Sequence, residues 1–220
     1  MLTPQLSVKM GVIGSGKDYQ AKNMAKTCPG VWVQIDFKDA LIDMCEDLCG
    51  FPIRARYDEF KEYIIGFQHP NATLAGTLQR DSQMVFNKQC CKDYPQALTG
   101  RRMLQRMGTD VMRKRDPDYW VHAWAQSAAA AIQAGKSVAC GDCRFLNEML
   151  IVEELAKQLE VSATITFCDY HSKRYDAASP HESERLAQQI LASGVKDLEL
   201  ITYAQALAAA EKAIVGVQGI

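Results

Sequence analysis

Residues 8–18 read VKMGVIGSGKD. Apolar side chains dominate 8–13, as in a short buried strand, and glycines follow at once. Residues 17–26 then carry Ala21, Met24 and Ala25 at the spacing of one helix face. This stretch predicts a strand, a glycine-rich loop and a helix in direct succession, which is the opening unit of an α/β fold.

The loop in this unit fits the pattern G-x-x-x-x-G-K from Gly11 to Lys17. Its backbone N–H groups, the positive end of the following helix and the lysine charge suit a polyphosphate. A dinucleotide fingerprint would need a small residue at position 19, which is tyrosine. We therefore expect ATP to contact residues of this loop, namely Gly11, Ile13, Gly14, Ser15, Gly16, Lys17 and Asp18.

Asp18 stands where this pattern usually has a serine or threonine that binds Mg²⁺. A carboxylate can hold the ion directly or through water. It can also simply favour the first helical turn through the helix dipole. Both interpretations of Asp18 remain open from the sequence, and Mg²⁺ is expected as the companion of ATP.

The strand and helix signals continue to alternate along the chain. Further strands are predicted at 31–35, 137–141, 161–167 and 198–201, with helices at 37–49, 103–112, 120–132, 145–159 and at the end of the chain. Residues 51–98 show a helical stripe at Phe60, Ile64 and Phe67 and no clear strand. We expect one domain over 1–220, a three-layer α/β/α architecture with a five-stranded parallel sheet, a helical insertion about 51–135 and a short lid about 169–180.

Charge and composition exclude some classes of protein. The 220 residues contain 25 Lys or Arg against 26 Asp or Glu, which argues against a general nucleic-acid or membrane-surface binder. No apolar run reaches the roughly 20 residues of a membrane span. Residues 1–5 lack the basic start and apolar core of a secretory signal. A cytoplasmic protein is expected.

Eight cysteines raise the question of a metal site. The pairs Cys45 with Cys49 and Cys140 with Cys143 have short spacings, but a structural zinc site needs two compatible ligand pairs. The first pair is predicted in a helix and the second at a strand. Reduced thiols are the expectation in a cytoplasm, and a zinc-binding interaction module is the less favoured alternative.

Two further segments carry charge that suits anionic ligands. Residues 101–115 hold six Lys or Arg and a single acidic residue, Asp110. This run predicts either a second phosphate site or a solvated helix face. Asp142 ends a predicted strand, where a carboxylate can meet Mg²⁺ or substrate, whereas Arg144 lies close enough to pair with it as a loop clip.

Five segments together resemble the bacteriophage deoxynucleoside monophosphate kinases. They are GVIGSGKD at 11–18, DFKDAL at 36–41, LQRMGTDVMR at 104–113 followed by WV at 120–121, DCRFLNE at 142–148, and HESE at 181–184. A phosphate loop alone occurs in many families, but the third and fourth segments together are far more selective. The resemblance covers most of the chain except 51–98.

The resemblance implies a P-loop kinase, dimeric and active in the host cytoplasm, that uses ATP to convert deoxynucleoside monophosphates to diphosphates for viral DNA synthesis. It implies an acceptor pocket made by Lys38, Gly108, Thr109, Arg113, Trp120, Asp142, Arg144 and Glu148. It also implies a cationic lid containing Lys173 and Arg174. Charge on the transferring group would be neutralised by Lys17, Arg113, Arg144, Arg174 and Mg²⁺.

Two other functions are compatible with the same residues. A P-loop kinase of another phosphorylated acceptor, such as dephospho-coenzyme A or phosphomevalonate, would also need a phosphate loop and arginines. A regulatory or structural protein could bind ATP without transferring phosphate. Measuring ADP formation with different acceptors separates these possibilities.

Overall fold

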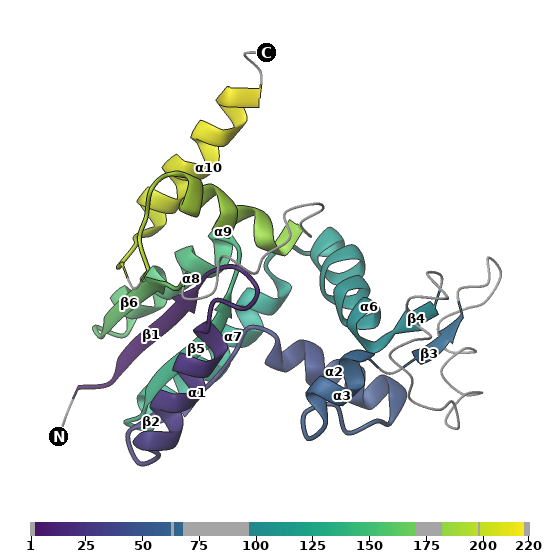
Figure 1. Ribbon diagram of the computed structural model, residues 1–220. Helices are drawn as coiled ribbons and strands as arrows, with labels where there is room; N and C mark the ends of the chain where they lie inside the picture. Colours follow the sequence, from purple (N-terminus) through teal and green to yellow (C-terminus); the bar gives the residue numbers. More distant parts are fainter. Residues whose placement is uncertain (1–2, 63, 68–96, 170–181, 198, 218–220) are drawn as a thin grey trace. The chain divides into compact units, whose positions relative to one another are not determined.

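The computed structural model describes all residues except 1–2, 63, 68–96, 170–181, 198 and 218–220. The chain forms two compact units (Figure 1). The first combines Met1–Phe37 with Val121–Ile220, and the second is Lys38–Trp120. The second unit begins and ends earlier in the sequence than the insertion expected at about 51–135.

A parallel sheet forms the centre of the first unit. Its strands are β1 (Gln5–Met10), β2 (Trp32–Gln34), β5 (Ser137–Cys143) and β6 (Ser162–Phe167). They lie in the order β2-β5-β1-β6, and every adjacent pair is parallel. The predicted α/β class with a parallel sheet is confirmed. The first strand is displaced from its predicted position at 8–13, because residues 11–13 already belong to the loop that follows β1.

The expected fifth parallel strand at 198–201 is wrong, and the sheet has four strands within the described residues. Leu200 instead forms a single antiparallel bridge with Thr166 of β6. On either side of it, the Phe167 N–H donates to Glu199 O at 2.8 Å and the Ile201 N–H donates to Ile165 O at 2.9 Å. Helix α10 (Tyr203–Val217) begins two residues after Ile201, so the segment has no room to become a longer strand.

Four further helices accompany the sheet in the described part of this unit. They are α1 (Lys17–Thr27), α7 (Tyr119–Gln133), α8 (Leu146–Gln158) and α9 (Glu182–Ala192), although α7 begins in the second unit. The core joins the fully buried β1 residues Leu6, Val8 and Met10 to apolar residues of α7, α8, α9 and α10. No helix in the described part of the chain combines the length and apolar character needed to cross a membrane.

An aromatic pair anchors α7 to the end of β2. The Phe37 and Trp124 rings stack with centroids 4.6 Å apart. The Trp124 indole N–H also donates to Ile35 O at 3.0 Å. Both aromatic side chains are almost fully buried. This packing fixes the segment 35–37 just beyond the carboxyl end of β2, where the candidate site lies.

The second unit contains a strand pair that the sequence analysis did not expect. Outside the undescribed residues 63 and 68–96, its helices are α2 (Asp39–Cys49), α3 (Tyr57–Glu62), α6 (Gly100–Gln105) and the π-helix η1 (Arg106–Arg113). Strand β3 (Ile64–Phe67) pairs antiparallel with β4 (Ala97–Thr99). The helical stripe expected at 60, 64 and 67 is therefore wrong, since α3 ends at Glu62 and the β-branched pair Ile64–Ile65 suits an extended chain.

A small core of its own supports this unit. Its buried members are Ile42, Cys45, Ile53, Phe60, Met103 and Leu104. Residues from α2, α3 and α6 thus meet in one cluster. The helix expected at 103–112 is present in two parts, as the end of α6 and the π-helix.

Candidate functional site

The loop between β1 and α1 has the curled backbone that its glycines suggested. Gly11, Gly14 and Gly16 have φ values of 147°, 80° and 84°. Gly16 lies in the left-handed region at the N-cap of α1, one residue before Lys17. Residues with a Cβ rarely adopt these angles. The chain therefore turns sharply from the end of β1 into the start of α1.

Two close contacts seat this loop on the sheet. A Cβ at Gly11 would lie 2.1 Å from the carbonyl oxygen of Cys168, just beyond β6. A Cβ at Gly141 on β5 would lie 2.9 Å from the Cα of Asp18. These distances are shorter than real Cβ contacts allow. The loop and the first turn of α1 thus pack against the carboxyl ends of β5 and β6. A larger residue at position 141 would clash with the backbone of α1.

Lys17 is the buried cation of this site. Its side chain is 2% exposed, and its Nζ donates to the carbonyl oxygen of Val12 at 3.1 Å. Nζ also lies 3.9 Å from Oδ2 of the exposed Asp18. Burial and then the charge of Arg144 lower the pKa of Lys17, and nearby carboxylates oppose that shift. The Lys17 side chain therefore folds back onto its own loop. The charged groups that act on it are the Arg144 guanidinium and the carboxylates of Asp18, Glu184 and Asp142.

Ser15 has a hydroxyl that lacks a partner among the described residues. The residue is fully buried and its Oγ accepts and donates no hydrogen bond. Leaving a buried hydroxyl unsatisfied costs about 1–3 kcal/mol. Among the buried side-chain atoms of the described residues, Asp169 Oδ1 also lacks a partner. Each such group needs an explanation, and for Ser15, which lies in the glycine-rich loop, a bound ligand supplies one.

Glu184 of α9 links the loop to Arg144. Its Oε2 accepts a hydrogen bond from the Ile13 N–H at 2.8 Å, and its Oε1 forms an ion pair with the Arg144 guanidinium. The Glu184 side chain is 1% exposed. Burial alone would lower the pKa of Arg144, but Glu184 and then Asp142 hold it raised. No role for Glu184 was predicted from the sequence. Glu184 appeared there only as the last residue of the HESE segment at 181–184.

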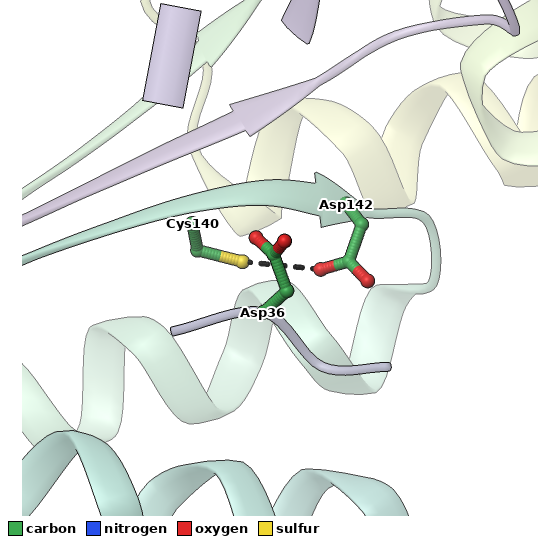
Figure 2. A group of neighbouring side chains, drawn as sticks. All are labelled: Asp36, Cys140 and Asp142. Atoms are coloured by element: carbon green, nitrogen blue, oxygen red, sulfur yellow. Dashed lines mark hydrogen bonds between the residues drawn. The ribbon is translucent and has the colours of Figure 1, made fainter. Parts of the chain in front are cut away.

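Two buried carboxylates join the ends of β2 and β5. Figure 2 shows Cys140 and Asp142 on β5 facing Asp36, which follows β2. Asp36 Oδ1 accepts from the Gly141 N–H at 2.7 Å, and Asp142 Oδ1 accepts from the Phe37 N–H at 2.8 Å. Cys140 and Asp142 are two residues apart on one strand, so their side chains share a face.

The thiol in this cluster adds a third possible metal ligand. Cys140 Sγ lies 3.3 Å from Asp142 Oδ1, and the ligand atoms of Asp36, Cys140 and Asp142 all lie within 4.8 Å of one another. Burial raises the pKa of Cys140 well above its usual value, with the two carboxylates acting in the same direction. Both carboxylates already accept a hydrogen bond from a backbone N–H. The main role of the cluster is therefore to link the carboxyl ends of β2 and β5.

Cysteine placement bears on the zinc alternative. Cys45, Cys140, Cys143 and Cys168 are buried free thiols, and Cys28 is an exposed one. Cys45 lies in the core of the second unit and Cys140 in that of the first. The side chains of Cys49, Cys90 and Cys91 are not among those that the structure describes.

Glu148 and Arg144 meet at the turn from β5 into α8. One carboxylate oxygen of Glu148 accepts from the Arg144 N–H at 2.6 Å and from the Phe145 N–H at 3.1 Å. Glu148 is 1% exposed. It therefore orders the backbone on both sides of Arg144 at the N-terminal end of α8. Of the predicted acceptor residues, Asp142, Arg144 and Glu148 lie together at the carboxyl edge of the sheet.

The other predicted acceptor residues belong to the second unit. Trp120 is 2% exposed, and its indole N–H donates to the carbonyl oxygen of Gly108 at 2.9 Å. Trp120 thus packs as a core residue of this unit in the structure. Lys38 precedes α2, and its carbonyl oxygen accepts from the Ile42 N–H at 2.9 Å.

Thr109 and Arg113 lie on the π-helix with Gly108. One Nη of Arg113 lies 3.4 Å from the carbonyl oxygen of Pro117. The remaining cations of the run 101–115 are exposed, as a solvated helix face would be. Lys173, Arg174 and the lid expected at about 169–180 lie outside the described residues, apart from Asp169.

No protein-family model matches the sequence, and no curated protein matches it either. The resemblance to deoxynucleoside monophosphate kinases therefore depends on the sequence motifs alone.

Proposed function

We propose that this protein is a P-loop kinase that transfers the terminal phosphoryl group of ATP to a deoxynucleoside monophosphate. The observation that carries the proposal is the loop at 11–17. It has three glycines at positive φ, a buried Lys17 at the start of α1, and a buried Ser15 hydroxyl with no hydrogen-bond partner among the residues that the structure describes. Backbone donors, a helix N-terminus and a cation together suit a polyphosphate.

The acceptor end of the proposed reaction relies on Arg144. This arginine lies beside the loop, since Glu184 contacts both Arg144 and the Ile13 N–H. A planar guanidinium binds a phosphate through two parallel hydrogen bonds. Two cations, Lys17 and Arg144, thus accompany one loop in the first unit. Contacts from Lys38, Gly108, Thr109, Arg113, Trp120 and Arg174 to the substrates stay predictions from the resemblance.

No general base is needed in such a reaction. The attacking atom is a phosphate oxygen that is already ionised at neutral pH. What the protein must supply is alignment of two polyanions and neutralisation of the charge between them. Lys17 and Arg144 carry that charge in the proposal. Their low exposure favours strong electrostatic interaction with a bound phosphoryl group.

Asp18 is the residue that fits a magnesium ion. Its carboxylate is a hard oxygen donor, its side chain is 58% exposed, and it lies beside Lys17 at the start of α1. Carboxylates of this kind hold Mg²⁺ together with water and substrate phosphates. When bound, such an ion offsets negative charge on the transferring group. The Asp36 and Asp142 carboxylates, in contrast, already hold the N–H groups of residues 141 and 37.

An assay of ADP release tests the proposal. The purified protein is given Mg²⁺, ATP and, in separate reactions, dGMP, dTMP, dCMP, dAMP and their ribose counterparts. ADP release that depends on one or more deoxynucleoside monophosphates is expected. ATP binding without ADP formation in any of these reactions would favour a protein that only binds nucleotide. Release only with dephospho-coenzyme A or phosphomevalonate would favour a kinase of another acceptor.

A further inference from the structure

Glu184 bonds both to the glycine-rich loop and to Arg144. Its two carboxylate oxygens are divided between them, with Oε2 on the Ile13 N–H at 2.8 Å and Oε1 on the guanidinium. The partners are 171 and 40 residues away along the chain. A single rigid carboxylate therefore fixes the loop and the arginine relative to each other.

Burying the Glu184 carboxylate costs desolvation free energy, which suggests that its contacts with the loop and with Arg144 have a function. The side chain is 1% exposed, and Arg144 is 28% exposed. A buried ion pair gains little stability over apolar packing, because both charges lose water. It does fix geometry, since the guanidinium can meet the carboxylate only in a few orientations. Holding a geometry is therefore the better explanation for an ion pair at this position.

We propose that Glu184 is a positioning residue that holds the nucleotide loop at Ile13 and the Arg144 guanidinium in the relation required for phosphoryl transfer. This inference rests on the proposed function, in which the loop binds ATP and Arg144 binds the acceptor phosphate. Glu184 itself need touch neither substrate. It acts through the two groups that do, and a displacement of about 1 Å between them is enough to lower turnover on the order of 100-fold.

Two substitutions at Glu184 separate the two contacts. Glu184→Gln keeps the shape and keeps an oxygen that can accept from the Ile13 N–H, but it loses the charge that pairs with Arg144. Glu184→Ala loses both contacts. Glu153→Gln is the matched control, because the exposed Glu153 accepts a backbone hydrogen bond from Tyr203 N–H at 2.7 Å at a distance from the loop.

Turnover and ATP binding are measured separately. For Glu184→Gln we expect turnover at saturating ATP and monophosphate to fall about 10- to 100-fold. The dissociation constant for ATP, measured without acceptor, should change less than about threefold, since Lys17 and the loop are intact. Glu153→Gln should match the wild-type protein in both. An equal loss of ATP affinity and turnover in Glu184→Gln would contradict positioning through Arg144.

A double variant tests whether Glu184 acts through the arginine. In an Arg144→Ala background, Glu184→Gln should change turnover less than about threefold, because the group it positions is gone. Transfer of labelled phosphate is sensitive enough to follow the slow variants. The same 10- to 100-fold loss in both backgrounds would overturn the inference. This double variant also leaves no unpaired guanidinium, so we expect it to fold even if Glu184→Gln alone does not.

Hydrogen exchange tests the loop contact without any activity. Amides in 11–17 should exchange faster in Glu184→Ala than in Glu184→Gln or the wild-type protein. Unchanged exchange in Glu184→Ala would remove the loop half of the proposal. If the wild-type protein transfers no phosphate, the proposed function fails and this inference falls with it. If the wild type is active and Glu184→Gln equals Glu153→Gln, the inference alone fails.

Discussion

Asp36 and Asp142 each accept a hydrogen bond from the backbone N–H of the residue beside the other. The Asp36 carboxylate accepts the Gly141 N–H next to Asp142, and the Asp142 carboxylate accepts the Phe37 N–H next to Asp36. Both side chains are about 5% exposed. The reciprocal arrangement fixes the carboxyl ends of β2 and β5 side by side, at the edge where the loop, Arg144 and Glu184 also lie.

Asp36→Ala is expected to lower the free energy of unfolding by about 1–3 kcal/mol, because it leaves the buried Gly141 N–H without its acceptor. Urea denaturation measures this loss. Asp197→Ala is the control, since the exposed Asp197 also accepts one backbone hydrogen bond, from Asp169 N–H at 2.6 Å. A loss no larger than that of the control would show that the clip contributes little.

Ser15→Ala is expected to leave stability unchanged or to raise it by about 1 kcal/mol, since it removes a buried hydroxyl that lacks a partner. The same substitution should weaken ATP binding, measured by calorimetry. Ser193→Ala is a control of opposite sign, because Ser193 Oγ donates to Ile190 O at 2.7 Å. A clear loss of stability in Ser15→Ala would mean that the hydroxyl is satisfied within the protein.

Lys17→Met should abolish ATP-dependent turnover while the protein stays folded. Methionine fills much of the space of the buried side chain but carries no charge for a phosphoryl group. Lys22→Met, on the exposed side of the same helix, serves as the control. Turnover within about threefold of wild type would discredit the assignment of the loop, since a P-loop lysine contributes directly to charge neutralisation.

Arg144→Ala should raise the KM for the monophosphate more than the KM for ATP. Loss of a charge-assisted hydrogen bond to a phosphate corresponds to about 1.5–3 kcal/mol, or roughly 10- to 100-fold in affinity. Steady-state kinetics with each substrate varied in turn measures the two constants. Arg185→Ala, an exposed arginine on α9, controls for net charge. Equal changes in both KM values would remove Arg144 from the acceptor pocket.

Much of the first unit was predictable because its signals are local. Buried parallel strands appear as apolar runs, so β1, β2, β5 and β6 were found to within a few residues. The glycines at 11, 14 and 16 indicated a loop with positive φ angles, and the pattern G-x-x-x-x-G-K that ends at Lys17 indicated a phosphate loop.

The errors have a common physical cause. The predicted strand at 198–201 has apolar residues at 198, 200 and 201, but only its partner, β6, decides that the segment runs antiparallel and forms one bridge at Leu200. The spacing of residues 60, 64 and 67 fits one helix face. It fits equally well the observed structure, in which residue 60 lies in α3 and residues 64 and 67 lie in β3, because a short apolar run does not define a single period. Tertiary pairing overrode local pattern in both segments.

The site depends still more on long-range contacts. The bond from the Gly141 N–H to Asp36 spans 105 residues, and that from the Ile13 N–H to Glu184 spans 171. Nothing in the sequence near Glu184 indicates a partner in the loop. Sequence alone therefore located the loop and Asp142, but it did not find the carboxylate that connects the loop with Arg144.

Transfer of labelled phosphate from ATP tests the central claim most directly. The protein is incubated with Mg²⁺, ATP labelled in its terminal phosphate, and a deoxynucleoside monophosphate, and the products are separated by chromatography. We expect label in the deoxynucleoside diphosphate with the wild-type protein and none with Lys17→Met. Label that stays in ATP, or appears only as inorganic phosphate, with every deoxynucleoside monophosphate would contradict the account.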